Sequence, residues 1–288
     1  MANEGMSPAK IAIIVAVVIV IIAVIVIIYR VNQSKAKTEP MLISKPTSST
    51  NIQPIKGVKA PLSITGREYT YNFWINIRSW HSTTEPQCVL YRSSNGPDVS
   101  YENGGGIANP SIWLYPNENK MMVRVSTIKG DTVYDKNTYA NSPIVNGGSD
   151  GSTQYTAVNP ASLAAANNND KSAWLQTSYA CDIDNIPLQR WVQVTAILWN
   201  RTLDVYINGK LVRSCILPGI PVHEDDELQT IYVGSNKTFN GYISRLKYYN
   251  RAITAKDVMT LYERGPLPVN WWWQALKNRV KVTLDINN

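Results

Sequence analysis

Residues 203–212 read Leu-Asp-Val-Tyr-Ile-Asn-Gly-Lys-Leu-Val, and this stretch predicts a β-hairpin. The apolar residues Leu203, Val205 and Ile207 occupy every second position, which is the period of a strand with one buried face. The pair Asn208-Gly209 accepts the two positive φ angles of a type I′ turn, so we expect the chain to return antiparallel after it.

The segment after the hairpin predicts one more strand and a short helix. Gly241–Tyr249 has a strand pattern. Thr254 and Asp257 then supply a hydroxyl and a carboxylate that can satisfy the free N–H groups at a helix start. Gly265-Pro266 ends the predicted helix.

Four short motifs follow one another in this part of the chain: Trp191–Val194, Tyr206–Lys210, Phe239–Ile243 and Tyr249–Ala252. Their order resembles the end of a laminin-G-like domain of the concanavalin A-like lectin/glucanase superfamily, and Tyr69–Ile75 resembles the first core strand of that family. The resemblance spans Pro61 to Pro268. It implies an all-β fold, a two-sheet antiparallel jelly-roll sandwich.

The rest of this span agrees with an all-β fold, because short strand patterns alternate with turns rich in Gly, Pro and Asn. The predicted strands are 69–77, 89–92, 112–115, 121–128, 191–199, 203–207, 210–214, 228–233 and 241–249.

The N-terminal part predicts one transmembrane helix over residues 11–29, an unbroken apolar run between Lys10 and Arg30. At about 1.5 Å per residue the run reaches about 28 Å, close to the roughly 30 Å of a bilayer core. It is longer than the apolar region of a signal peptide, and no small-x-small cleavage site follows it. The predicted membrane-spanning positions include Ile11, Val15, Val18, Ile22, Ile25 and Tyr29.

Charges beside the helix predict its orientation. Arg30, Lys35 and Lys37 follow the span, whereas Lys10 and the terminal amine, offset by Glu4, precede it. The positive-inside rule therefore favours a cytosolic, or capsid-facing, sandwich by one or two charges. The extracellular side stays the alternative, and there the N-x-S/T sequons at Asn32, Asn200 and Asn236 would matter.

Five segments are expected along the chain. Residues 1–10 flank the helix, 11–29 span the bilayer, 30–60 form a flexible linker, 61–268 form the sandwich, and 269–288 form a Trp-rich basic tail. The linker prediction rests on its polar composition and three prolines, which are typical of a coil that would span roughly 30 Å. A polar insert over 129–172 is either a functional loop or a solvated one without a specific role.

The net charge of +7 does not indicate nucleic-acid binding. Residues 1–60 carry seven basic and two acidic residues, residues 271–288 carry three and one, and the remainder carries eighteen of each. The sandwich is therefore neutral, whereas nucleic-acid binding usually requires a basic face on the folded domain.

Cys88, Cys181 and Cys215 are too few for a disulfide framework, so we expect three half-buried thiols. A Cys181–Cys215 pair is the alternative, which sequence alone does not establish. The sequence contains no CxxC or Cys/His cluster typical of a zinc site.

We expect no enzyme activity. Relatives with glucanase activity carry a Glu-x-Asp-x-x-Glu run on one strand, and this sequence has no such run. Laminin-G-like domains often bind Ca²⁺ through loop oxygens, so calcium is the one cofactor considered. The weak candidate ligands, which do not match the ligand positions of the family, are Asp182, Asp184, Asp225 and Asp226.

Two groups of residues predict binding surfaces. Trp271, Trp272 and Trp273 are adjacent and cannot all point to one side, so with Lys277 and Arg279 they predict a partner-docking tail or a tail packed on the sandwich. Both alternatives rank above contact with a membrane interface. The candidate ligand-loop aromatic residues are Tyr101, Trp113, Tyr134, Tyr139 and Trp174.

Two functions follow. The first is a non-enzymatic, membrane-anchored scaffold that docks other proteins, such as capsid or scaffold subunits, near a bilayer. This architecture resembles membrane proteins of large DNA virus particles, where a minor structural component would link an inner membrane to the capsid. The second is a surface lectin or adhesin that binds glycans, with or without calcium.

Overall fold

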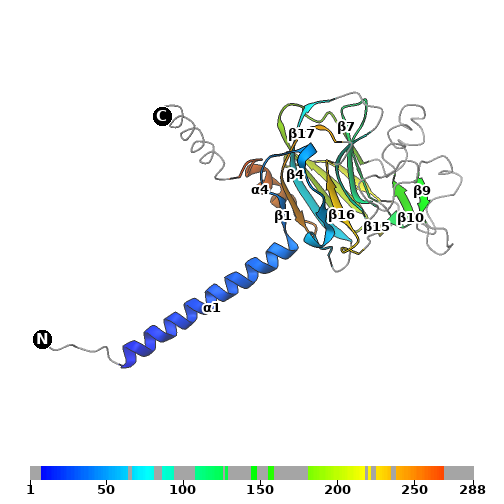
Figure 1. The fold of residues 1–288 in the computed structure, drawn as a ribbon. Coiled ribbons are helices and arrows are strands. Elements are labelled where there is room, and N and C mark those ends of the chain that lie inside the picture. The colour runs from blue at the N-terminus through cyan, green and yellow to red at the C-terminus, as the bar shows by residue number, and fades with distance from the viewer. Residues whose placement is uncertain are drawn as a thin grey trace, which may run out of the picture.

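The structure is a computed structural model that describes residues 8–63, 67–80, 86–93, 108–125, 127–128, 144–147, 155–158, 181–217, 220–221, 225–234 and 238–268. Figure 1 shows packed β-sheets with one long helix, α1 (Pro8–Thr38), extending away from them. The predicted antiparallel sandwich preceded by one apolar helix is confirmed.

Two large antiparallel sheets make up the sandwich. The first has the order β1 (Met41–Ile43), β17 (Asn240–Tyr249), β4 (Glu68–Ser79), β12 (Trp191–Trp199), β13 (Thr202–Ile207) and β14 (Lys210–Ile216), with β2 (Thr47–Ser48) also paired to β17. The second has the order β11 (Cys181–Asp184), β7 (Lys120–Arg124), β6 (Ala108–Leu114), β5 (Gln87–Ser93), β16 (Thr230–Val233) and β3 (Ile55–Lys56).

A smaller sheet lies at one side of the sandwich (Figure 1) and has the order β15 (Ile220–Pro221), β8 (Thr127–Ile128), β10 (Tyr155–Val158) and β9 (Ile144–Gly147). Two of its strands, β9 and β10, belong to the polar insert predicted over 129–172. They pair antiparallel from Ile144 opposite Val158 to Gly147 opposite Tyr155. This part of the insert is therefore a hairpin and not a loop without secondary structure.

The core lies between the two large sheets and is built from alternating positions. On β4 and β12, Phe73 is opposite Val194 and Tyr71 is opposite Ala196, and all four side chains are fully buried. Val123 on β7 belongs to the same buried cluster from the opposite sheet. Removal of this apolar surface from water is the main force that holds the sheets together.

The hairpin over residues 203–212 forms as predicted. β13 and β14 are joined by Asn208 and Gly209, whose φ angles are 50° and 79°. A Cβ atom on Gly209 would lie 2.8 Å from the sulfur of Met259 on α4 (Ala255–Glu263), so a larger residue here would also require the Met259 side chain to shift.

Helix α4 covers the outer face of the first sheet and begins with the predicted cap. The Thr254 hydroxyl accepts the N–H of Asp257, and the Asp257 carboxylate accepts the N–H of Thr254. Val258 is buried against the sheet, and Tyr262 stacks on Trp74 with ring centroids 5.7 Å apart.

The flexible linker predicted over 30–60 is wrong for this structure. Helix α1 continues to Thr38, and the chain then enters the sandwich at once through β1. Two short 3₁₀ helices, η1 (Ser49–Asn51) and η2 (Gly57–Lys59), separate the small strands that follow. The prolines that suggested a coil lie between these strands and helices, where φ near −65° suits turns and edge segments.

The expectation of three thiols is also wrong. Cys181 and Cys215 form a disulfide with a Cα–Cα distance of 5.9 Å, whereas Cys88 is a buried thiol. The disulfide joins β11 to β14, which are edge strands of the two sheets. It therefore closes one open side of the sandwich.

Candidate functional site

The junction between α1 and the sandwich is fixed by backbone hydrogen bonds. The carbonyl of Thr38 accepts the N–H of Asn250 at 3.0 Å, and the carbonyl of Pro40 accepts the N–H of Tyr248 at 3.1 Å. Tyr248 lies near the end of β17, one of the central strands of the first sheet, and Asn250 directly follows this strand. The helix is thus joined to the core of the domain without an intervening hinge.

Glu39 strengthens this junction through two ion pairs. Its carboxylate lies 2.9 Å from Arg251 and 3.5 Å from Lys247. Both cations also lie over the ring of Tyr249, at 5.9 Å and 4.5 Å from its centroid. Burial, together with the nearby Glu39 carboxylate, raises the pKa of Tyr249 to about 12, so this phenol is neutral at physiological pH.

Helix α1 has the composition of a membrane-spanning or signal segment. Among the described residues, one helix is long and apolar enough to cross a membrane, over Ala16–Thr38, and none of this span is buried in the protein. The predicted spanning positions Val18, Ile22, Ile25 and Tyr29 are all exposed along it. Ile11 and Val15 lie in the same helix.

Asp226, a candidate calcium ligand, is engaged by an arginine. Its carboxylate pairs with the guanidinium of Arg92 on β5 and accepts the N–H of Leu62 at 3.1 Å. The Arg92 side chain is fully buried and also donates to the Ala60 carbonyl at 2.6 Å and to Gln229. This arrangement neutralises a buried cation, which is a structural role.

Asp182 and Asp184 are engaged in a similar way on the second sheet. Asp182 lies 2.6 Å from Arg124 and accepts the hydroxyl of Tyr115 at 2.7 Å, while Asp184 lies 3.4 Å from Lys120. Burial raises the pKa of Tyr115, which keeps its hydroxyl protonated as the donor to Asp182.

The four aspartates therefore do not form one site. Asp225 is exposed in the turn before β16, where its backbone carbonyl accepts the N–H of Leu228. Within the part of the chain that the structure describes, no three His, Cys, Asp or Glu side chains come together as a metal site would require.

Trp113 lies on a strand and not in a ligand loop. It belongs to β6, is 3% exposed, and stacks on Tyr91 with ring centroids 5.6 Å apart. Tyr91 also stacks on Tyr232 at 4.8 Å, and the Trp113 indole donates to the Ser111 hydroxyl at 2.6 Å. These rings form a buried aromatic cluster with Cys88, Tyr115 and Met122. Trp113 is therefore a packing residue, since a glycan-stacking ring must be exposed.

Several predicted site residues lie outside the described residues. They are the ligand-loop candidates Tyr101, Tyr134, Tyr139 and Trp174 and the tail residues Trp271, Trp272, Trp273, Lys277 and Arg279.

The prominent exposed tryptophan among the described residues was not predicted. Trp199, at the end of β12, is 58% exposed. Its position as the last residue before the Asn200-Arg201 turn was the only available signal, because burial decreases where a strand leaves the sheet.

Similarity to known proteins identifies the fold class independently of the structure. A family model described as the concanavalin A-like lectin/glucanases superfamily matches residues 111–259. No curated protein gives a significant match.

Solved structures give a distant likeness. The binding domain of botulinum neurotoxin DC in complex with rat synaptotagmin II is 15% identical, with a TM-score of 0.35 over 71% of this chain and 37% of that one. The binding domain of botulinum neurotoxin serotype D is 12% identical, with a TM-score of 0.37 over 69% of this chain and 37% of that one. Trypanosoma rangeli sialidase is 13% identical, with a TM-score of 0.33 over 68% of this chain and 22% of that one. The chain thus spans between about a fifth and two fifths of these proteins, and likeness at this level carries no argument about function.

The family match covers just over half of the sequence and includes the end of β6, all of β12, β13, β14 and β17, and the start of α4. The chain therefore belongs to the concanavalin A-like lectin/glucanase superfamily.

Proposed function

We propose that the protein is a non-enzymatic, single-pass membrane protein whose lectin-type sandwich docks other proteins close to the bilayer. The fixed junction between α1 and β17 carries this proposal. A flexible tether would let the domain sample many orientations, whereas the bonds from Thr38, Glu39 and Pro40 hold one orientation relative to the helix. A constant orientation suits a scaffold that links a membrane to a second layer, such as a capsid shell.

The membrane anchor is tested by extraction. Full-length protein expressed in cells should stay in the membrane pellet after washing with alkaline carbonate, because none of the described residues buries the apolar span of the 31-residue helix and a bilayer would cover it. Release into the supernatant, with loss of residues 1–30 by mass spectrometry, would identify a cleaved signal segment instead.

The cations Arg30, Lys35 and Lys37 support a cytosolic or capsid-facing sandwich. The sequon at Asn200 provides the test, because this residue is exposed in the turn between β12 and β13. If the sandwich faces the cytosol, protease added to cells in which only the plasma membrane has been permeabilised should cut the domain. Asn200 should then carry no glycan. A protected and glycosylated domain would reverse the orientation.

The docking role is tested on the Trp-rich tail. Replacement of Trp271, Trp272 and Trp273 by Ala should release a co-purifying protein without lowering the melting temperature. Trp199→Ala is the matched control, since it removes an exposed indole from the sandwich itself. A lower melting temperature with the partner retained would show that the tail packs on its own domain.

A surface lectin or adhesin is the second candidate, and the Cys181–Cys215 disulfide favours it. Disulfides persist on the extracellular or lumenal side of membranes and are rare in the cytosol. This candidate predicts that the protein migrates as a disulfide-bonded species from cells whose thiols were blocked before lysis, and that it is retained on a glycan array. Fully reduced cysteines and no glycan retention, with and without calcium, would reject it.

A further inference from the structure

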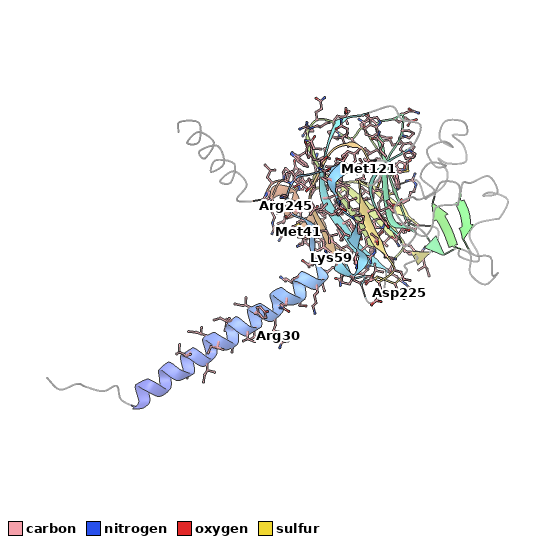
Figure 2. All side chains as sticks on the ribbon, in the orientation of Figure 1. Arg30, Met41, Lys59, Met121, Asp225 and Arg245 are labelled. Carbon is pink, nitrogen blue, oxygen red and sulfur yellow. A yellow bond between two sulfur atoms is a disulfide. The ribbon has the colours of Figure 1, made fainter. Side chains whose placement is uncertain are left out.

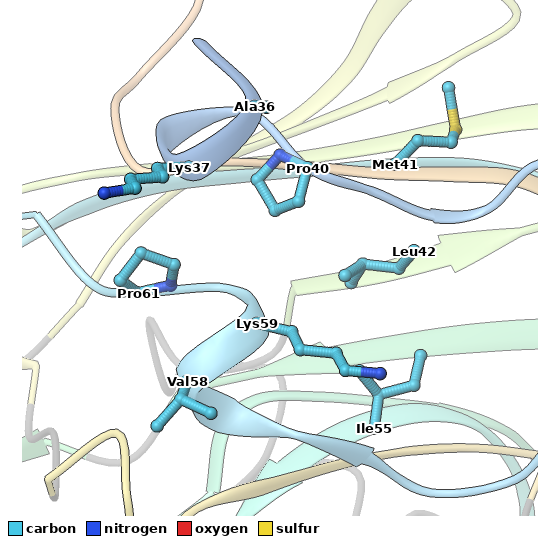
Figure 3. Close-up of a pocket in the computed structure, with 9 residues that line it drawn as sticks. All are labelled: Ala36, Lys37, Pro40, Met41, Leu42, Ile55, Val58, Lys59 and Pro61. Atoms are coloured by element: carbon cyan, nitrogen blue, oxygen red, sulfur yellow. The ribbon is translucent and has the colours of Figure 1, made fainter. Parts of the chain in front are cut away.

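A groove lies where the apolar helix meets the sandwich. It has a volume of about 550 Å³, within the range of small-molecule sites. Figure 3 shows it between the end of α1 with the start of β1 on one side and the segment around η2 on the other. Its lining residues are Ala36, Lys37, Pro40, Met41, Leu42, Ile55, Val58, Lys59 and Pro61.

The lining combines exposed apolar side chains with cations. Met41 and Val58 are apolar but are 44% and 49% exposed, so they do not belong to the core. Lys37 and Lys59 are both exposed, and Figure 3 places their ammonium groups on different sides of the groove. None of the described residues that line the groove is acidic.

The segment that supplies the groove lining is itself basic, although the acidic turn Asp225–Glu227 lies beside η2. Residues 31–60 contain five lysines and one acidic residue, Glu39. All five lysines are exposed, whereas Glu39 is already paired with Arg251 and Lys247. An incoming anion would therefore meet cations that no carboxylate of this segment neutralises.

With residues 11–29 across the bilayer, as proposed above, the groove would lie near the lipid headgroups. From Arg30, which ends the apolar run, to Lys37 the helix rises about 10 Å. The headgroup layer is about 5–8 Å thick on each side of the bilayer, and a lysine side chain can extend several ångströms further toward it. Figure 2 shows Met41 and Lys59 close to the sandwich end of α1, with Arg30 further along the helix.

We propose that this groove binds the headgroup of an acidic phospholipid from the membrane that α1 spans. Lys37 and Lys59 contact the anionic headgroup, and Met41 and Val58 contact the apolar part of the same lipid. The inference rests on the proposed membrane anchor. It adds a bound ligand that holds the base of the sandwich against the bilayer.

The test uses the full chain in nanodiscs made of phosphatidylcholine with or without phosphatidylglycerol. Lipids that remain bound after transfer to detergent are counted by native mass spectrometry. Phosphatidylglycerol should be retained in preference, and K37Q/K59Q should bind it about 30-fold more weakly, since each lysine near a membrane surface contributes about fivefold. K210Q/K256Q is the matched control, because both lysines are exposed on other parts of the sandwich.

A second variant separates the groove from general surface charge. Val58→Trp keeps both lysines but fills the groove at an exposed position, so the fold is retained while lipid retention falls. Equal retention by wild type, K37Q/K59Q and V58W would overturn the proposal. Displacement of the lipid by millimolar inorganic phosphate would assign the groove to free anions instead. If the chain fails to insert into nanodiscs, the membrane anchor itself is wrong, which is a different outcome from insertion without lipid preference.

Discussion

Replacement of Asp226 by Asn is expected to destabilise the sandwich strongly, although this residue lies in a surface turn. The Arg92 side chain is 0% exposed, and its charge is compensated by Asp226, which is 27% exposed. Asparagine keeps the shape and can still accept the N–H of Leu62, but it removes the negative charge. A buried arginine is then left uncompensated.

The magnitude follows from this burial. Removal of one partner of a fully buried pair costs about 3–5 kcal/mol, and the partial exposure of Asp226 lowers the expected value to about 2–3 kcal/mol. For a domain of this size that corresponds to roughly 5–10 °C in melting temperature. Asp225→Asn is the matched control, because Asp225 is exposed and adjacent.

The assay is thermal unfolding of the full chain in detergent, with and without a chelator. We expect D226N to melt well below D225N, and the chelator to leave wild type unchanged. Equal melting temperatures for the two variants would refute the ion-pair argument. A wild-type melting temperature that falls in chelator would restore a metal-binding role for Asp226.

Three further predictions concern stability. Reduction of the Cys181–Cys215 disulfide, which closes a loop with a sequence separation of 34, should lower the free energy of unfolding by about 3–4 kcal/mol, and a C181S/C215S variant should be insensitive to dithiothreitol. Thr254→Ala should cost about 1 kcal/mol at pH 7. Hydrogen bonds from Thr254 lower the pKa of Asp257, so this stability is present above the unfolded pKa and is lost as pH falls through the folded pKa, where urea titrations of the two proteins should converge. The pH dependence expected for Tyr249 is opposite. Because its pKa is raised to about 12, its contribution to the free energy of unfolding is complete below pH 10 and is lost as the pH rises toward 12. Alkaline unfolding followed by phenolate absorbance will detect this loss.

Local patterns in the sequence were sufficient for much of the fold. The Asn208-Gly209 turn, the Thr254 cap and the strands on either side depend on residues that are close along the chain, and each has a specific backbone requirement. Helix α1 was predictable for the same reason, although its end was not. Residues 30–38 contain no Gly or Pro, and the first proline is Pro40, but their polar composition suits a coil as well as a helix. The contacts that hold Thr38 come from Asn250, more than 200 residues later.

The candidate sites were harder to predict because burial and pairing are long-range properties. Asp182 and Asp226 have the residue type of calcium ligands, but Arg124 and Arg92 on neighbouring strands already neutralise them. Trp113 has the residue type of a glycan platform, but its side of the strand is occupied by the Tyr91 ring. The two cysteines are 34 positions apart, and only the approach of two sheet edges brings them together.

Because hydrogen bonds join α1 to the end of β17, the direction in which the sandwich faces around the helix axis depends on the number of residues in the helix. Each residue of an α-helix turns the chain by about 100° and advances it by about 1.5 Å. If α1 spans a bilayer as proposed, one alanine inserted between Val31 and Thr38 would therefore turn the sandwich about 100° around the helix axis, and a partner bound on one side of the domain would meet a different surface. Seven inserted residues complete almost two turns and would restore the original direction, at about 10 Å greater height. Partner binding in such an insertion series would rise and fall with the helical period. With a flexible tether, partner binding would not depend on this period.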